Sequence, residues 1–309
     1  MLKIDFNKAF KKVLIAYGVV FLVGIIIAVT MGVKLDINFS GGAKLAYSYT
    51  GDIAEKDIEE VVKKHIKADF SVTKSESMTD KSTTFEIALA GKNALSSKQQ
   101  EELDTDLIKT FKDNKVEIFS SNSVSPTIAG TFFLKSMVAV VITAVLVVIY
   151  VGFRFRKIGG VSAAVTALVA LVFDVLVTFF TCVIFRLQID SNYIAVVLTI
   201  LGYSLNDTIV IYDRVRENKG LMPSAEIGEL VNGSINQTVK RNIITSVTTF
   251  LAVMTIVVVS ELNGLTSLRT FAIPMAFGLL SGGISSLFVS GPLWVVYKRR
   301  KNAKKAKKA

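Results

Sequence analysis

Cysteine, histidine and proline are all scarce in this 309-residue sequence. Cys182 is the only cysteine and lies in an apolar run, which excludes a disulfide framework and a cysteine metal cluster. His65 is the only histidine and has lysines around it in a polar region, so we expect a solvated side chain and no metal site. The four prolines and the lack of low-complexity linkers argue against a disordered or fibrous chain.

Apolar residues, in contrast, are abundant and come in long blocks. They make up 51% of the chain, and the mean hydropathy is +0.52, too high for an ordinary soluble domain. Six segments are long enough to cross about 30 Å of hydrocarbon. They are Val13–Met31, Phe132–Phe153, Val161–Phe185, Tyr193–Tyr212, Ile243–Ser260 and Phe271–Tyr297. The first is too long for a cleaved signal peptide, and no small-residue cleavage site follows it before Asp36.

The net charge of +11 is distributed in a way that predicts orientation. The last twelve residues, 298–309, carry eight Lys or Arg and no acid, which is typical of a topology signal in contact with membrane lipids and not of a nucleic-acid site. Basic residues also precede the first span and fill the loops after spans two and four, whereas the alternate loops hold one Arg each. We therefore expect both termini in the cytoplasm.

The long segment between the first two spans, residues 32–131, is then expected outside the cytoplasm. Its thirteen lysines are outnumbered by sixteen acids. Alternating and helical apolar patterns predict strands over 43–49, 70–74, 84–90 and 115–120 and helices over 54–67 and 96–111. The order βαββαβ is the ferredoxin-like split arrangement. The predicted fold is a polytopic α-helical membrane protein with six transmembrane helices and an inserted α+β ferredoxin-like extracytoplasmic domain. Its parts are 1–31 (cytoplasmic N-terminus and first span), 32–131 (outer domain), 132–297 (spans two to six) and 298–309 (basic cytoplasmic tail).

The most informative stretch runs from Leu201 to Asn218 and reads LGYSLNDTIVIYDRVREN. An apolar run precedes it, so Asn206 and Asp207 fall inside the fourth span. A carboxylate within a span costs at least about 2.5–3.5 kcal/mol, so it usually has a partner, a water-filled cavity or a function. The stretch resembles the SecF family of bacterial protein-export subunits, in which an N-D-T/S-I-V-V/I-x-D-R-I/V-R-E-N run closes the fourth span.

Two connectors between the spans and the outer domain extend this resemblance. Residues 36–42 read DINFSGG and residues 124–130 read VSPTIAG. They are similar to the family's D-F-x-G-G turn and its V-x-P-x-x-x-G approach to the second span, although Asn38 stands where the family usually has Asp. Gly41, Gly42 and Pro126 are candidate hinge residues, and the alternative is a tight turn and a proline at a helix start.

The resemblance implies a function in protein export. In SecF-type proteins the Asp of the span-four motif and the Arg at the head of the next span are implicated in proton use, and Asp207 and Arg241 occupy those positions. Asp174 resembles the Asp of the family's H-D-V-L-I/V-T element, although Phe173 replaces the His. The resemblance also implies a SecD partner, association with the SecYEG channel, a translocating precursor polypeptide, and use of the proton motive force across the bacterial cytoplasmic membrane.

Asp207 is the leading candidate for chemistry. Burial in a bilayer favours the protonated carboxyl and a nearby Arg favours the carboxylate, so movement of the Arg would load and release a proton. Arg241, expected at the start of span five, can reach Asp207, and Arg214 competes because it lies at i+7 on the same helix face. The alternative is a static ion pair that locks spans four and five together. For Asp174, proton relay and structural hydrogen-bond acceptor are equally open.

The other motif residues have structural interpretations. Asn206 and Thr208 are expected to hydrogen-bond between helices, or else to line a water path. A charged cluster at the cytoplasmic surface is expected to anchor the loop that follows it, and consists of Asp213, Arg214, Arg216, Glu217 and Asn218. Glycines beside Pro274 predict close packing and a kink in span six, namely Gly278, Gly282 and Gly283.

Motifs of the common enzyme classes are missing. No G-x-x-x-x-G-K-S/T string occurs, so we expect no ATP hydrolysis. Two membrane aspartates are a feature of intramembrane aspartyl proteases, but Asp207 belongs to Ser-Leu-Asn-Asp and not to Gly-x-Gly-Asp. Helical rise places Asp174 and Asp207 about 12 Å apart along the membrane normal, too far to share a water. We expect no enzyme activity and no cofactor, with the proton as the coupling ion.

Two other functions fit the same outline. A passive scaffold would stabilise the export complex, with Asp207 as a static link between helices. An exporter half of the resistance-nodulation-division (RND) type, to which the family resemblance implies distant kinship, would move small molecules or lipids. An exporter of this type would be expected to have a second repeat in the chain and a large substrate pocket. This chain has six spans and a small outer domain, which argues against that function.

Overall fold

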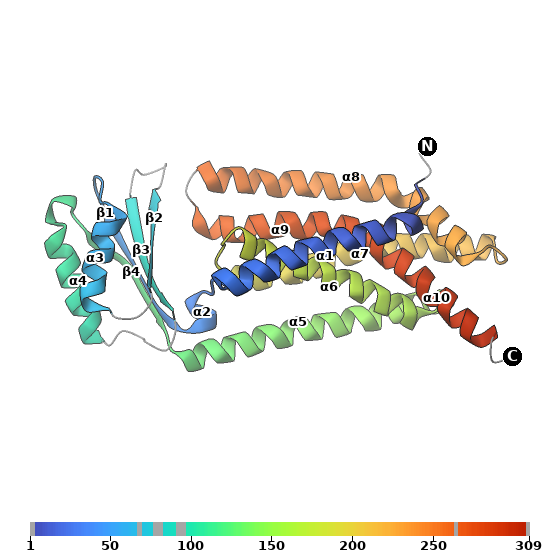
Figure 1. The fold of residues 1–309 in the computed structure, drawn as a ribbon, viewed down its shortest axis with the longest axis horizontal. Helices are drawn as coiled ribbons and strands as arrows, with labels where there is room; N and C mark the ends of the chain where they lie inside the picture. Colours follow the sequence, from blue (N-terminus) through green and yellow to red (C-terminus); the bar gives the residue numbers. More distant parts are fainter. Residues whose placement is uncertain (1–3, 67–69, 77–82, 91–96, 263–264, 307–309) are drawn as a thin grey trace.

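The computed structural model describes residues 4–66, 70–76, 83–90, 97–262 and 265–306. Six of the described helical segments are long and apolar enough to cross a membrane, and each contains most of one predicted span. They are α1 (Phe6–Met31), α5 (Pro126–Arg154), α6 (Gly160–Ile184), α7 (Ser191–Leu221), α8 (Ile227–Leu262) and a composite of α9 (Thr266–Ser285), the π-helical turn η3 (Ser286–Ser290) and α10 (Gly291–Ala306). Figure 1 shows them as one bundle, with the sheet domain at one end and both termini at the other.

The bundle has a buried centre and a lipid-like exterior. Helices α6 and α7 and the composite last span are the most buried segments, whereas α1, α5 and α8 expose large apolar side chains along most of their length. Such exposure is expected where hydrocarbon replaces water as the solvent. The functional residues on α6 and α7 therefore lie in the interior of the bundle.

The segment between spans four and five is a helical hairpin and not the loop that the sequence suggested. Helix α7 continues to Leu221, and α8 already begins at Ile227. Buried apolar residues at helical spacing, such as Val215 and Ile235, extend the core beyond the hydrophobic spans. The chain's N-terminus is fixed to this hairpin, because the amide of Phe6 donates a 2.8 Å hydrogen bond to Asn232 Oδ1.

The outer domain contains a four-stranded antiparallel sheet, and its element order is the one predicted. Strands β1 (Gly42–Tyr49), β2 (Phe70–Glu76), β3 (Thr83–Ala90) and β4 (Glu117–Val124) are arranged in the order β2-β3-β1-β4. Helix α3 (Glu55–His65) follows β1, and α4 (Ser97–Thr110) with the 3₁₀ turn η1 (Lys112–Asn114) follows β3. Figure 1 places α3 and α4 on the face of the sheet that points away from the bundle. Strand β4 extends beyond its predicted end at residue 120; the prediction stopped there because the next three residues are polar.

The domain core lies between the sheet and these two helices. Alternate residues of β1 are buried, and the Tyr47 ring stacks on Phe85 with centroids 5.0 Å apart. The Tyr47 hydroxyl donates a 2.5 Å hydrogen bond to Asp104 on α4, and burial raises the pKa of this tyrosine. His65 is half-buried, contrary to expectation: it bonds Asp106 Oδ2 at 2.8 Å, and this bond lowers the pKa of Asp106.

The two connectors between bundle and domain pack on each other. The first contains a short helix, α2 (Ile37–Ser40), whose start is capped by Asp36. Asn38 takes part in that cap, donating a 2.7 Å hydrogen bond from Nδ2 to Asp36 Oδ1. Gly41 follows with φ +74°, and a Cβ built on it would lie 2.9 Å from Pro126 Cα. Pro126 is the first residue of α5, so the alternative of a tight turn and a helix-starting proline describes this junction.

The first connector also pairs with the loop between α6 and α7. The amide of Asp36 donates to Ile189 O at 3.0 Å, and the amide of Ile189 donates to Lys34 O at 2.9 Å. Arg186 in the same loop donates to the carbonyls of Met31 and Gly32 at 2.9 and 2.7 Å. The end of α1 and the start of α7 are thereby joined by backbone contacts that no sequence pattern indicated.

Candidate functional site in the membrane bundle

Asp174 lies at the centre of the bundle and is surrounded by serine hydroxyls. Its side chain is fully buried. Ser204 of α7 donates a 2.6 Å hydrogen bond to Oδ2, Ser285 of α9 donates to the same oxygen at 2.9 Å, and Ser281 donates to Oδ1 at 2.6 Å. Three neutral donors on two neighbouring helices thus satisfy the carboxyl group that α6 places in the core.

Glycines on α9 let the helices approach closely enough for these bonds. A Cβ at Gly282 would lie 2.9 Å from Ser204 Cβ, and a Cβ at Gly278 would lie 2.1 Å from Ile200 Cδ1. A Cβ at Gly283 would lie 2.7 Å from Ser246 Oγ. The predicted close packing in span six is therefore confirmed, and it brings α7 and α8 onto α9 around the aspartates.

The last span changes direction at η3 and not at Pro274, where the sequence suggested a kink. Pro274 lies inside the continuous helix α9. Figure 1 shows α10 turning away from the line of α9 after η3. The π-helical turn begins at the boundary between Ser285, which bonds Asp174, and Ser286, which bonds α7. Such turns are frequent at functional sites.

Hydroxyl groups extend from Asp174 in both directions. On one side, Ser281 Oγ lies 3.0 Å from the hydroxyl of Tyr17 on α1. On the other, Ser286 Oγ donates to Ser204 O at 3.2 Å and lies 3.0 Å from Thr208 Oγ1. The contact of Thr208 with Ser286 confirms the expected bond between helices. A polar path therefore runs from α1 through the bundle centre to the residue next to Asp207.

Asp207 is also buried, with 2% of its side chain exposed, and it accepts a 3.3 Å hydrogen bond from Ser246 Oγ of α8. Neither candidate arginine forms an ion pair with it in the described part of the chain. Arg214 donates instead to Glu217 and to Gln237, each at 2.5 Å. The static ion pair considered from the sequence is therefore wrong for this structure.

Arg241 occupies a different position from the one expected. Helix α8 begins at Ile227, roughly four turns before Arg241, so this residue does not start the helix. Its side chain is exposed and forms no ion pair with Asp207.

The separation of the two carboxylates also needs correction. Ser204, which bonds Asp174, precedes Asp207 by three residues, or about 4.5 Å of helical rise. The separation of about 12 Å along the membrane normal that span lengths suggested is therefore too large. The case against an aspartyl protease then depends on the motif around Asp207 and not on depth.

Asn242 belongs to this site and was missed. It is 1% exposed, and neither polar atom of its side chain has a hydrogen-bond partner among the described residues. It lies one turn before Ser246 on the same face of α8, the face that meets Asp207. The predicted fifth span began at Ile243, because Lys240 and Arg241 interrupt the apolar run just before it. Asn242 therefore fell outside the predicted span. A buried amide of this kind is suited to binding an internal water.

The charged end of the motif holds the hairpin together. Asp213 receives 3.0 Å and 2.7 Å contacts from Arg154 of α5 and from Arg216. Asn218 is buried and donates 2.8 Å hydrogen bonds to Ser234 and to Gln237 on α8. These are the contacts expected of an anchor, although they fix a helical hairpin and not a loop.

Asn206 forms no hydrogen bond between helices among the described residues, contrary to expectation, and its side chain is exposed on α7. It continues a stripe of small exposed residues at helical spacing, which consists of Ala195, Thr199, Gly202 and Asn206. The exposed residues of α5 and α8 are instead mostly bulky and apolar, as at Val145 and Leu251. The described residues contain no group of three or more His, Cys, Asp or Glu side chains placed to hold a metal ion.

Comparisons with known proteins agree with this arrangement. A family profile described as "Protein export membrane protein SecD/SecF, C-terminal" matches residues 104–300. The protein translocase subunit SecF of Petrotoga mobilis is 30% identical over 92% of this chain and 93% of its own length. The chain belongs to the SecF family.

Fused members of the family are longer than this SecF-family chain. The protein translocase subunit SecDF of Bacillus subtilis is 33% identical over 96% of this chain but only 38% of its own length. A crystal structure of SecDF from Thermus thermophilus, described as a translocon-associated membrane protein, has a TM-score of 0.79 at 27% identity. The match covers 96% of this chain and 39% of that one, so this chain spans well under half of the fused proteins.

Proposed function

We propose that this SecF-family chain works with a SecD partner to drive protein export with the proton motive force. The observation that carries the proposal is the pair of membrane aspartates. Asp174 and Asp207 lie inside the bundle on neighbouring helices and accept hydrogen bonds from hydroxyl groups. A carboxyl group that neutral donors hold can exist with or without its proton, whereas a permanent ion pair fixes the charged form.

Asp207 is the proposed proton carrier. Ser246 holds its carboxyl, the Asn242 amide one turn before Ser246 would bind a water, and the exposed Arg241 would change its distance from Asp207. Approach of Arg241 would favour the carboxylate and its withdrawal the protonated form. Asp174 and its serines would pass the effect of this change to α1, α6 and α9, because they bond all three helices to α7.

The small-residue stripe on α7 is the proposed contact with SecD. SecDF relatives carry SecD and SecF in one chain, which supports a SecD partner here. Small residues let membrane helices pack closely, whereas bulky apolar residues suit lipid. The exposed Asn206 would find there the interhelical partner that it lacks within the described chain.

The outer domain is the proposed binding site for the precursor polypeptide. Its element order and its strand order β2-β3-β1-β4 support a ferredoxin-like fold. The basic residues in short loops support an orientation with both termini in the cytoplasm, so that this domain would face outward. In a bacterial cytoplasmic membrane it would then lie beside the SecYEG channel. Rearrangement of the spans would move the domain through the Gly41–Pro126 junction and bias an emerging precursor outward.

The test is export of a secreted precursor by membrane vesicles that carry Asp207→Asn at wild-type abundance, with and without a proton gradient. We expect loss of the gradient-stimulated part of translocation with the SecD complex intact. Export that still responds to the gradient would overturn the proposal. A loss that follows reduced abundance would instead indicate a scaffold, and gradient-driven efflux of a small molecule or lipid would indicate an exporter of the RND type.

A further inference from the structure

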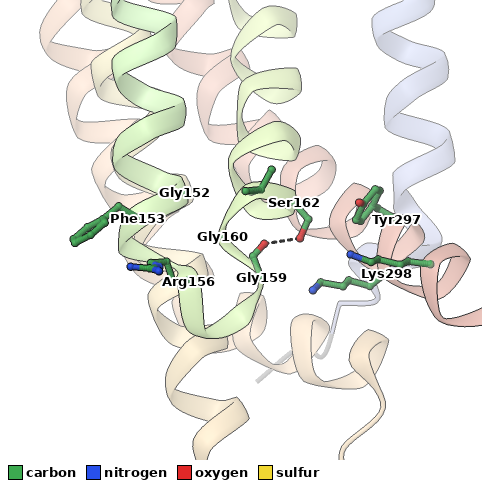
Figure 2. A pocket seen from close by; sticks show the side chains of 10 residues that line it. Gly152, Phe153, Arg156, Gly159, Gly160, Ser162, Tyr297 and Lys298 are labelled. Atoms are coloured by element: carbon green, nitrogen blue, oxygen red, sulfur yellow. Dashed lines mark hydrogen bonds between the residues drawn. The ribbon is translucent and has the colours of Figure 1, made fainter. Parts of the chain in front are cut away.

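A cavity of about 570 Å³ opens at the end of the bundle where both termini lie, far from the sheet domain (Figure 1). Three segments line it: the end of α5, the turn that leads into α6, and α10. Figure 2 shows Gly159 and Gly160 in the middle, with Arg156 on one side and Tyr297 and Lys298 on the other. A cavity of this size accommodates a small organic ligand.

The lining of the cavity is positively charged. Of the described residues that line it, three are basic and none is acidic; the basic ones are Arg156, Lys298 and Lys301. Helix α6, which is 25 residues long, starts at Gly160, so the positive end of its dipole adds to the same field. The chemistry of the lining selects for an anion.

Two neighbouring basic residues outside the cavity are already paired. Arg154 contacts Asp213 and Arg299 contacts Glu226, each at 3.0 Å, and the latter contact lowers the pKa of Glu226. Within the described chain, neither Arg156 nor Lys301 has a carboxylate within ion-pair distance. The charges of Arg156 and Lys301 are therefore not neutralised by a carboxylate of the described chain.

Glycines keep the floor of the cavity open. Gly159 has φ +104°, a conformation that favours glycine, and a Cβ on Gly160 would lie 2.0 Å from Gly152 O. Ser162 fixes the turn by donating a 2.6 Å hydrogen bond to Gly159 O (Figure 2), and it accepts a 3.0 Å hydrogen bond from Trp294 Nε1. The floor is thus rigid backbone with few side-chain atoms.

The rim of the cavity is apolar and exposed. Phe153 and Val161 are 73% and 75% exposed, and Tyr297 is 46% exposed. In a six-span protein these side chains lie where the membrane surface meets the last turns of the helices, so their neighbours are lipid chains. A basic floor beside an apolar rim matches a molecule that has an anionic head and a hydrocarbon tail.

We infer that this cavity binds the phosphate headgroup of an anionic phospholipid, with Arg156 and Lys301 as its main cationic contacts. Phe153 and Val161 contact the first methylenes of the acyl chains. A bound lipid would join α5, α6 and α10 at the end of the bundle and stabilise their packing. A free phosphate would use the basic floor alone and leave the apolar rim without a ligand.

The experiment measures lipid binding and thermal unfolding of the full-length protein in a neutral detergent. The probes are phosphatidylglycerol, zwitterionic phosphatidylcholine and inorganic phosphate. The test variant is Arg156→Gln with Lys301→Gln, and the matched control is Arg300→Gln with Lys304→Gln, which removes the same charge from α10 residues outside the cavity. A third variant, Arg156→Lys with Lys301→Arg, preserves both charges and shows whether the test variant loses binding through its charge or through misfolding.

We expect phosphatidylglycerol to raise the unfolding temperature of the wild-type protein and of the control. In the test variant its affinity should fall on the order of 25-fold, because each basic residue near an anionic headgroup contributes about a fivefold factor. The charge-preserving variant should keep most of the affinity. Equal losses in the test and control variants would overturn the assignment, since they would reflect net charge alone. Equal stabilisation by phosphatidylcholine or by inorganic phosphate would overturn it as well.

Discussion

Ser281 of α9 donates a 2.6 Å hydrogen bond to Asp174 of α6, and its hydroxyl is also 3.0 Å from Tyr17 of α1. One small hydroxyl therefore connects three helices at the depth of a fully buried carboxyl group. Together with Ser204 and Ser285, it gives Asp174 three hydroxyl donors from two helices. Because a hydroxyl group can accept as well as donate, these serines can hold the carboxyl with or without its proton.

Loss of one of these donors should weaken the bundle. Ser285→Ala removes a 2.9 Å hydrogen bond to a fully buried carboxyl, so we expect the free energy of unfolding to fall by about 1–2 kcal/mol. Thermal unfolding of the purified protein in detergent measures the change. Thr248→Ala is the control, because among the described residues the exposed hydroxyl of Thr248 bonds its own helix alone, at Ile244 O. Equal effects of the two substitutions would show that Ser285 does not support Asp174.

Replacement of Asn242 should separate function from stability. Asn242→Leu removes a buried amide that lacks a partner among the described residues, so we expect stability to stay equal or to rise. Export driven by the proton gradient should fall severalfold, because the polar group next to Asp207 is lost. The measurement is vesicle export at matched abundance, with Val247→Leu on the exposed face of α8 as the control. Full gradient-driven export by Asn242→Leu would exclude a role for this amide.

The exposed stripe on α7 should control assembly with SecD. Gly202→Leu places a bulky side chain in the stripe, and we expect recovery of a tagged SecD partner to fall at least severalfold in affinity purification. Gly18→Leu on α1 is a matched control, because a Cβ at either glycine has no atom of the described chain within 4 Å. Equal recovery with both variants would place the SecD contact on another face.

The junction of the two connectors should tolerate no side chain at Gly41. Gly41 has φ 74° and ψ 169°, and a Cβ on it would lie 2.9 Å from Pro126 Cα. Gly32 has nearly the same backbone angles, φ 69° and ψ 172°, but a Cβ there meets no atom within 4 Å. We expect Gly41→Ala to cost about 1–3 kcal/mol more than Gly32→Ala, because only the former adds a clash to the backbone strain. Thermal unfolding of both variants tests this, and equal costs would mean that the junction can open.

The spans and the order of elements in the outer domain could be predicted because they depend on local patterns. Runs such as 132–153 are apolar at all but a few positions, and Leu45, Tyr47 and Tyr49 alternate as a half-buried strand requires. Such patterns predict the elements correctly because each segment removes from water the face that its own sequence makes apolar.

Parts of the site could not be predicted because they depend on contacts between distant segments. The helical hairpin after span four is charged, and its stability comes from buried residues such as Val215 and Ile235 within mixed sequence. The serines that surround Asp174 lie 30 to 111 residues away along the chain. The spacing of four serines in span six, at 281, 285, 286 and 290, was the available signal, although only the first two of them bond Asp174. That spacing fits one helical face only after the π-helical turn is known.

The pairing of the first connector with the α6–α7 loop gives the outer domain a second mechanical link to the bundle. A pull on the domain loads the strand-like contact between Leu35 and Ile189 as well as the ends of α1 and α5. Ile189 is followed by Asp190, which caps the start of α7, so the tension reaches the helix that carries Asp207 within two residues. Tension from a bound precursor polypeptide and a change in the charge of Asp207 would thereby act on the same helix, α7. A precursor that stops moving would then alter how readily Asp207 takes up its next proton.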